Sequence, residues 1–274
     1  MKEFYKVQSA GNDFVLVEVS QDKVADLNGV EWREFVKRCC VRKIGIGADG
    51  VLVVYQDNNG WNMRIFNADG TEAEMCGNGL ACVAHFLRRV KRVNEEQIEI
   101  NTLAGKQVVK VEGDVVEERI AYYSLEAKDV PYTGDGVLEV VIDGEKKIYE
   151  LDAVSVGNPH AVFIVDDFSD FEFIGKMLQN HPHFPEKVNV EFVKILKLGK
   201  SECEVKARVW ERGVGETLSC GTGTVAIGAA LNKRFGVDRI KVDWPGGVLE
   251  VRFSVKDVYL ILNPRLVYRG EFMN

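Results

Sequence analysis

Short runs in which hydrophobic and polar residues alternate dominate this chain. The runs are rich in β-branched residues and are separated by turn sequences such as Asp-Gly and Gly-Gly. Both features are typical of half-buried strands. We therefore predict strands at residues 14–19, 51–55, 97–100, 107–112, 138–142, 160–165, 202–210 and 248–255.

Helical spacing of apolar residues is less frequent than strand-like alternation. It predicts four helices, over residues 31–40, 80–90, 171–180 and 224–235. The second and the fourth are apolar nearly all round, which is typical of a helix buried on every side. We expect each of these two to lie inside a wrapped sheet.

The two apolar helices follow nearly the same phrase. Residues 70–84 read GTEAEMCGNGLACVA and residues 215–228 read GETLSCGTGTVAIG, so Cys76 and Cys220 stand 220 − 76 = 144 positions apart. Each phrase follows a predicted strand, WNMRIF (61–66) before the first and VKARVW (205–210) before the second. A pattern that appears twice at long range indicates a duplicated α+β domain and excludes a short solenoid repeat. Two such domains facing each other would form a cleft, which is a usual place for a ligand site.

Composition and charge narrow the class of protein. The 274 residues are 46% hydrophobic and 28% charged, which is the balance of a soluble globular protein. A net charge of −7 argues against nucleic acid as a partner. We see no apolar run long enough to cross a membrane and no secretory signal, so we expect a cytoplasmic protein. Its six scattered cysteines are then expected to be thiols, and their spacing predicts no metal site.

The chemistry of the repeated phrase follows from what a helix start offers. Unpaired backbone N–H groups and a partial positive charge attract anions, and they favour the thiolate of a nearby cysteine. Four glycines give an anion access to these groups: Gly77, Gly79, Gly221 and Gly223. Asn78 and Thr222 add polar side chains. Two such turns on opposite sides of one carbon would supply a base and an acid for inverting its configuration. This scheme predicts a racemase or epimerase and requires no cofactor.

Structural interpretations of the cysteines compete with this hypothesis. A lone buried cysteine is usually a small core residue, and we interpret Cys39, Cys40, Cys82 and Cys203 in this way. A structural disulfide between Cys76 and Cys220 would have to form in a reducing cytoplasm, which disfavours it. The presence of a thiol in both copies of the phrase favours a functional pair.

Seven motifs, in order, carry a resemblance to a known family. They are GNDF (11–14), GIGADG (45–50), FNADGTEAEMCGNG (66–79), GNPH (157–160), NVEFV (189–193), WERGVGETLSCGTG (210–223) and PGG (245–247). Along its whole length the chain resembles the diaminopimelate epimerases. The resemblance implies interconversion of LL- and meso-diaminopimelate without pyridoxal phosphate or metal, in lysine and peptidoglycan precursor synthesis.

The resemblance also implies a fold and a set of site residues. The fold is α+β, with two pseudo-symmetric domains that each wrap a mainly antiparallel sheet around a central helix. The domains would comprise residues 1–118 with 263–274, and residues 119–262. Cys76 and Cys220 would be the catalytic acid and base, and His160 and Glu211 would tune their protonation. The implied substrate-binding residues are Asn12, Asn67, Gly77, Asn78, Asn158, Asn189, Glu211, Arg212, Gly221 and Thr222.

Several alternatives remain open at the level of sequence. An enzyme of the same fold could act on another substrate, as a proline racemase does, and an amino-acid sensor could use the same scaffold without catalysis. Oxidation of Cys76 and Cys220 to a disulfide could also control activity. Two positions, Gly50 and Ala81, depart from residues that other family members carry. The oligomeric state is undetermined, with a homodimer as one alternative.

Overall fold

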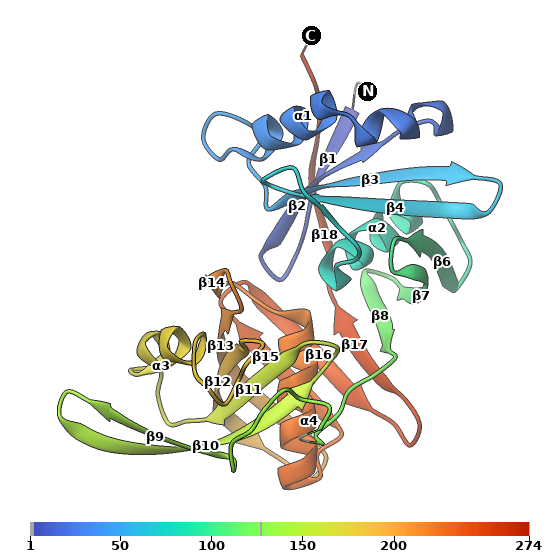
Figure 1. Cartoon of the computed structure of the whole chain (residues 1–274). Coiled ribbons are helices and arrows are strands. Elements are labelled where there is room, and N and C mark those ends of the chain that lie inside the picture. Colours follow the sequence, from blue (N-terminus) through green and yellow to red (C-terminus); the bar gives the residue numbers. More distant parts are fainter. Residues whose placement is uncertain (1–2, 127, 274) are drawn as a thin grey trace. The chain divides into compact units, whose positions relative to one another are not determined.

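The computed structural model describes residues 3–126 and 128–273. Two compact units divide the chain, one comprising Met1–Glu118 with Ile261–Asn274 and the other comprising Arg119–Leu260. The helices are a 3₁₀ helix, η1 (Gln21–Asn28), and the α-helices α1 (Val30–Cys40), α2 (Gly77–Arg89), α3 (Phe171–Leu178) and α4 (Gly221–Phe235). Strands form most of the remainder of each unit (Figure 1).

The strands of the first unit precede and follow its long helix. They are β1 (Glu3–Ser9), β2 (Asn12–Glu18), β3 (Gly50–Asp57), β4 (Gly60–Asn67), β5 (Glu72–Ala73), β6 (Gln97–Thr102), β7 (Gly105–Glu112) and β18 (Arg265–Glu271). Two further strands, β8 (Val115–Ile120) and β17 (Val258–Leu262), span the boundaries between the units. The second unit holds β9 (Val137–Ile142), β10 (Glu145–Ser155), β11 (Pro159–Ile164), β12 (Asn189–Leu198), β13 (Glu202–Glu211), β14 (Gly215–Thr217), β15 (Arg239–Trp244) and β16 (Gly247–Phe253).

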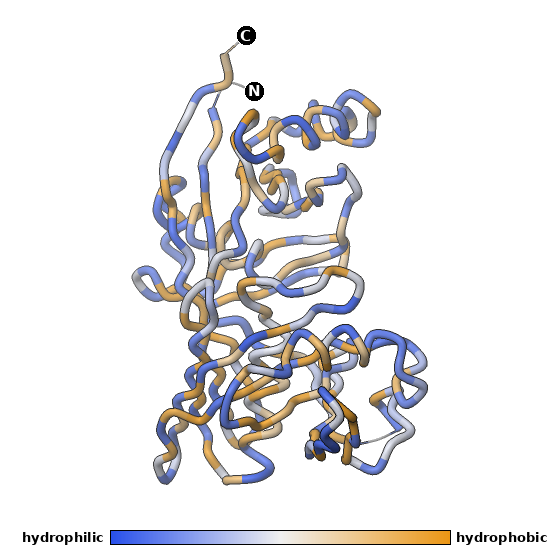
Figure 2. Tube along the Cα trace, turned by 90° about the vertical axis from the view of Figure 1, so that its left-hand side faces the viewer, coloured by the Kyte–Doolittle hydropathy of each residue, from blue (hydrophilic) through white to orange (hydrophobic). Residues whose placement is uncertain are grey.

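One buried helix lies inside the sheet of each unit. In the first unit, α2 packs against β1, β2, β3, β4, β6, β7 and β18, and in the second, α4 packs against β10, β11, β12, β15 and β16. Residues 78–87 of α2 and residues 223–231 of α4 are all buried. Hydrophobic and hydrophilic residues alternate along many of the strands around them (Figure 2). This arrangement confirms the predicted wrapped sheet around a central helix.

The strand pairing repeats from the first unit to the second. Parallel β2–β3 corresponds to parallel β11–β12, and antiparallel β3–β4 corresponds to antiparallel β12–β13. The short β5 pairs with β4 as β14 pairs with β13, and the parallel pairings β4–β6 and β13–β15 also match. In each unit the buried helix follows the short strand. The duplication that the repeated phrase predicts is therefore present in the topology.

The predicted elements are found, but several others are not foreseen by the pattern. All four predicted helices exist, and α2 and α4 begin three residues earlier than predicted, at the glycines of the repeated phrase. The pattern does not predict some strands, because charged residues interrupt some of them and others are short; these are β1, β5, β8, β10, β12, β14, β15 and β17. Among the residues described, no helix is both long and apolar enough to span a membrane.

Candidate active site

The first cysteine turn, residues 76–79, forms the start of α2. Cys76 is the N-cap residue, with the extended backbone (φ −149°, ψ 122°) that this position requires, and its carbonyl accepts a hydrogen bond from Leu80 N–H at 2.8 Å. Asn12, at the start of β2, donates from Nδ2 to Cys76 Sγ at 3.8 Å. The half-buried thiol therefore sits at the positive end of a buried helix, with an amide donor beside it.

The other predicted residues of the first unit lie around this turn or beside it. Asn78 is only 5% exposed, and its Oδ1 has no hydrogen-bond partner within the described part of the chain. Asn67 is exposed at the end of β4, where its Nδ2 donates to Thr71 Oγ1 at 3.0 Å. The structure thus joins Asn12 directly to the Cys76 thiol, while Asn67 is held by the loop that leads to the turn.

A buried carboxyl group that sequence reasoning did not single out lies against the first cysteine turn. Glu118 on β8 is 8% exposed, and a Cβ atom added to Gly77 would lie 2.8 Å from its Oε2. Burial raises the pKa of Glu118 to about 7. Gly77 is therefore a position where a side chain would collide with this carboxyl group.

Glu118 is expected to make the folded protein less stable as the pH rises. Its folded pKa lies above the unfolded value of 4.5, so its stabilising contribution is complete below pH 4.5 and is lost through pH 7. Glu118→Gln cannot ionise, so it should gain up to about 3 kcal/mol over the wild type above pH 8 and little at pH 4.5. Urea unfolding of both proteins at pH 4.5 and pH 8.5 measures this difference. An equal gap in unfolding free energy at the two pH values would contradict it.

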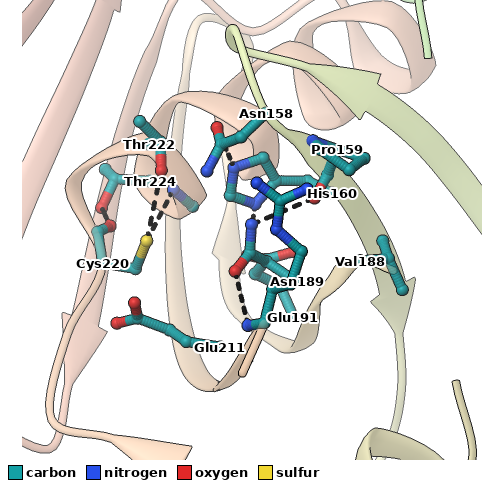
Figure 3. Close-up of polar contacts among 12 residues, drawn as sticks. Asn158, Pro159, His160, Val188, Asn189, Glu191, Glu211, Cys220, Thr222 and Thr224 are labelled. Atoms are coloured by element: carbon teal, nitrogen blue, oxygen red, sulfur yellow. Dashed lines mark hydrogen bonds and ion pairs between the residues drawn. The ribbon is translucent and has the colours of Figure 1, made fainter. Parts of the chain in front are cut away.

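The second cysteine turn, residues 220–223, forms the start of α4 in the same way. Cys220 is the N-cap residue, with φ −138° and ψ 122°, and its Sγ accepts from Gly223 N–H at 3.2 Å. Thr222 Oγ1 lies 3.3 Å from the same sulfur (Figure 3). The Thr224 hydroxyl donates to the Cys220 carbonyl at 2.8 Å and accepts from Trp244 Nε1 at 3.0 Å. These bonds fix the position of the sulfur at the helix start.

The charge state of Cys220 differs from what the helix start alone predicts. Burial raises the pKa of its thiol far above the ordinary value, and the carboxyl groups of Glu211 and Glu191 raise it further. The contacts from Thr222 and Gly223 lower it by less. In this structure, Cys220 is therefore a thiol and can act as a proton donor.

Alkylation of Cys220 in the folded protein is expected to be slow at pH 8. Iodoacetamide reacts with thiolates, and the raised pKa together with 9% exposure leaves little accessible thiolate. The rate, followed by peptide mapping, should fall at least about tenfold below that of Cys220 in urea-unfolded protein. Equal rates for the folded and unfolded chains would show that Cys220 is an accessible, ordinary thiol.

Three further predicted residues surround the second turn. Glu211, at the end of β13, accepts from Thr217 Oγ1 at 2.5 Å, as Asn67 pairs with Thr71 in the first unit. Burial raises the pKa of the Glu211 carboxyl, and the Thr217 bond lowers it by less. Asn189 accepts from the backbone N–H of Arg212 at 2.9 Å and donates to the Pro159 carbonyl at 3.1 Å.

The guanidinium of Arg212 is exposed. Its Nη1 donates to the Glu186 carbonyl at 3.0 Å, and the guanidinium makes no other hydrogen bond with the described residues. The bond from its backbone N–H to Asn189 fixes the backbone of Arg212 in the turn that follows β13. Arg212 can therefore present a fork of N–H donors to a carboxylate.

His160 lies in a fully buried pair whose second member sequence reasoning missed. His160 Nδ1 is 2.6 Å from Glu191 Oε1, and both side chains are 0% exposed. His160 Nε2 is 3.0 Å from Oδ1 of Asn158, which is a predicted substrate-binding residue (Figure 3). Glu191 falls inside the NVEFV motif. Its signal is an acidic residue among apolar neighbours in the first half of β12, where residues 189–193 are all buried.

Comparison with known proteins identifies the family of this chain. The family model for diaminopimelate epimerase matches residues 4–127 and 152–265. The chain belongs to the diaminopimelate epimerase family. It is 40% identical to diaminopimelate epimerase of Desulforudis audaxviator, over 99% of both chains, and 37% identical to that of Moorella thermoacetica, over 98% of both chains. The expected resemblance is thereby confirmed.

The fold of this family member is shared with more distant proteins. A phenazine biosynthesis protein of the PhzF family from Enterococcus faecalis superimposes with a TM-score of 0.69 and 13% sequence identity. The match covers 100% of this chain and 99% of that one. The likeness confirms the fold class, and at this identity it concerns the fold alone.

Gly50 is one of the two positions that the resemblance singled out as departures. Gly50 begins β3, and a Cβ atom added there would lie 2.5 Å from the Phe66 carbonyl oxygen. Any larger residue would therefore need a shift of β3 relative to β4. The second of these positions, Ala81, is buried within α2.

Proposed function

We propose that the protein interconverts LL- and meso-diaminopimelate, with Cys76 and Cys220 as the two proton-transfer groups. One observation carries this proposal: the same thiol-bearing helix start is built twice, at corresponding places in a duplicated topology. Inverting one carbon needs a base on one face and an acid on the other. The relatives at 37–40% identity are diaminopimelate epimerases, which supports this substrate.

The proton transfers balance without any group besides the two sulfurs. The thiolate of one cysteine takes the Cα proton, and the electron pair of the broken C–H bond passes toward the substrate carboxylate. The thiol of the other cysteine then delivers its proton to the opposite face of the carbon. That cysteine is left as the thiolate, so the roles are exchanged for the reverse reaction. The raised pKa of Cys220 supports a cycle that begins with Cys220 as the thiol and Cys76 as the thiolate.

Charge develops on the substrate during the transfer and requires stabilisation. The Cα–H of an amino acid is a very weak acid, so the enolate-like oxygens need several donors. Among the N–H groups at the starts of α2 and α4, that of Gly223 donates to Cys220 Sγ, and the others have no acceptor within the first turn of their helix. Gly77 and Gly221 carry no side chain that would keep an anion away from them. Fixed helix dipoles favour this negative charge without further reorganisation.

The remaining polar residues suit a substrate with a second amino-acid head. In the proposal, the guanidinium of Arg212 binds the distal carboxylate and the carboxyl of Glu211 binds an ammonium group. The amides of Asn12, Asn67, Asn158 and Asn189 supply further contacts. Both cysteines must stay reduced, which is consistent with a cytoplasmic enzyme of lysine and peptidoglycan precursor synthesis.

A chiral assay separates this proposal from its rivals. Incubation with LL-diaminopimelate should produce the meso isomer, whereas L-proline should yield no D-proline. Turnover of proline alone would support a proline racemase-like enzyme and contradict the proposed substrate. Binding of diaminopimelate without any exchange of its Cα hydrogen for solvent deuterium would indicate an amino-acid sensor.

A further inference from the structure

The duplicated topology allows the buried pair His160–Glu191 to be compared with its counterpart in the first unit. In the parallel pairing β11–β12, His160 is opposite Asn189, and Glu191 follows two residues later. In the matching pairing β2–β3, Phe14 is opposite Gly50, and Leu52 follows two residues later. Phe14 and Leu52 thus stand where the second unit has His160 and Glu191.

Leu52 and Glu191 also lie against corresponding glycines of the two cysteine turns. A Cβ atom added to Gly79 would lie 3.0 Å from Leu52 Cδ2, and one added to Gly223 would lie 2.9 Å from Glu191 Oε1. The first unit fills this position with an apolar side chain, so the fold itself requires no carboxyl group there. The polar pair of the second unit therefore calls for an explanation in function.

The hydrogen bonds of the pair define how many protons it holds. Asn158 Oδ1 is an acceptor, so His160 Nε2 must carry a proton. The 2.6 Å separation of His160 Nδ1 and Glu191 Oε1 needs a second proton between them. Two protons make the pair neutral, whichever of the two atoms carries the second one. Within the described residues, Glu191 Oε2 has no hydrogen-bond partner, so the pair has no other means of neutralisation.

We propose that Glu191 is a positioning residue, which acts through His160 to fix the side-chain amide of Asn158 with its NH₂ group toward the substrate. Because Oδ1 accepts from His160, Nδ2 is directed away from the imidazole, and it bonds to no acceptor in the described chain. An NH₂ group suits a substrate carboxylate. An imidazole without a proton on Nε2 would turn the amide and present an oxygen to that carboxylate. This role rests on the proposed function, in which Asn158 binds substrate.

We call the chain of hydrogen bonds from Glu191 through His160 to Asn158 the relay. Three variants separate this relay from a purely structural role of Glu191. Glu191→Gln supplies an amide that can donate to Nδ1 and keep the proton on Nε2, so the KM for diaminopimelate should stay within about threefold. Glu191→Leu removes the hydrogen-bond partner of Nδ1, and KM should rise at least about tenfold. The double variant His160→Phe with Glu191→Leu reproduces Phe14 and Leu52 of the first unit, so it should fold, and its KM should rise at least about tenfold as well.

Glu250→Gln is the matched control, because Glu250 is a buried acid on β16 that is bonded to Arg239 and lies outside the proposed site.

Nitrogen-15 NMR of the histidine side chains tests the relay without any substrate. The spectrum of the wild type should show His160 with a proton on Nε2, and Glu191→Gln should keep it. In Glu191→Leu this protonated signal should be lost or reduced to a mixture of tautomers. Assignment to His160 follows from the signal that is missing in His160→Gln.

The outcomes distinguish failure of the relay from failure of the proposed function. A wild type without a proton on His160 Nε2 would overturn the relay, whatever the activity of the protein. So would a folded double variant with the KM of the wild type. If the wild type showed the predicted histidine signals but no turnover of diaminopimelate, the hydrogen-bond relay would stand and the proposed substrate would fail.

Discussion

Replacing Cys76 or Cys220 with alanine is expected to lower kcat for diaminopimelate epimerisation at least about 10³-fold, because each change removes a proton-transfer group. The two single variants should lose similar amounts, since inversion needs both steps. Serine at either position should also be nearly inactive, because a hydroxyl group is a much weaker acid than a thiol. Initial rates of meso-diaminopimelate formation from the LL isomer measure the loss.

A third cysteine provides the control for these variants. Cys203 is buried on β13 and has no place in the proposed site, so Cys203→Ala should retain the kcat of the wild type. It should cost stability alone, about 1 kcal/mol for a small buried side chain. Near-native turnover by Cys76→Ala or Cys220→Ala would mean that the missing sulfur is not a catalytic group.

Arg212→Gln is expected to lower kcat/KM for diaminopimelate about 100-fold, mainly through KM. In the proposed function, the guanidinium binds the distal carboxylate of the substrate, which is remote from the reacting carbon. The lost charge-assisted bonds therefore weaken binding more than they slow proton transfer. Steady-state kinetics over a range of diaminopimelate concentrations separates the two parameters.

Arg208→Gln removes the same charge from β13, the strand that ends just before Arg212, and is the matched control. Arg208 forms a two-point ion pair with Glu216, with both N–O distances at 2.8 Å, outside the proposed set of binding residues. Its replacement should change kcat/KM by less than about threefold, as expected for a surface pair. A loss at Arg208 equal to that at Arg212 would indicate a general charge effect instead of a specific contact.

The repeated phrase made much of this structure predictable from sequence. Two Cys-Gly-x-Gly turns before apolar helices predicted buried helices inside two similar sheets, and α2 and α4 have these positions. Their first residues were missed, because glycine has low helix propensity and its role at a helix start depends on the N-cap backbone. The strand β10 was missed because its first half, residues 145–150, carries four charged residues and is largely exposed.

Individual contacts of the site were less predictable than the elements that carry it. Glu191 and Glu118 gave little signal, because a buried acid in a strand resembles a solvent-facing one until its neighbours are known. The high pKa of the Cys220 thiol depends on burial and on the carboxyl groups of Glu211 and Glu191, which lie on two strands. The sequence showed only that Cys220 stands at a helix start. Aligning the two halves would have identified Glu191, since Leu52 occupies its place in the first unit.

Solvent-deuterium incorporation at early conversion tests the central claim, that two thiols act on opposite faces of one carbon. In D₂O the donor cysteine carries deuterium, whereas the other cysteine holds the proton taken from the substrate. The account predicts that newly formed meso-diaminopimelate carries deuterium at Cα while the remaining LL substrate is unlabelled. Equal labelling of substrate and product from the first turnovers would indicate a single base exchanging with solvent, and would contradict the two-thiol mechanism.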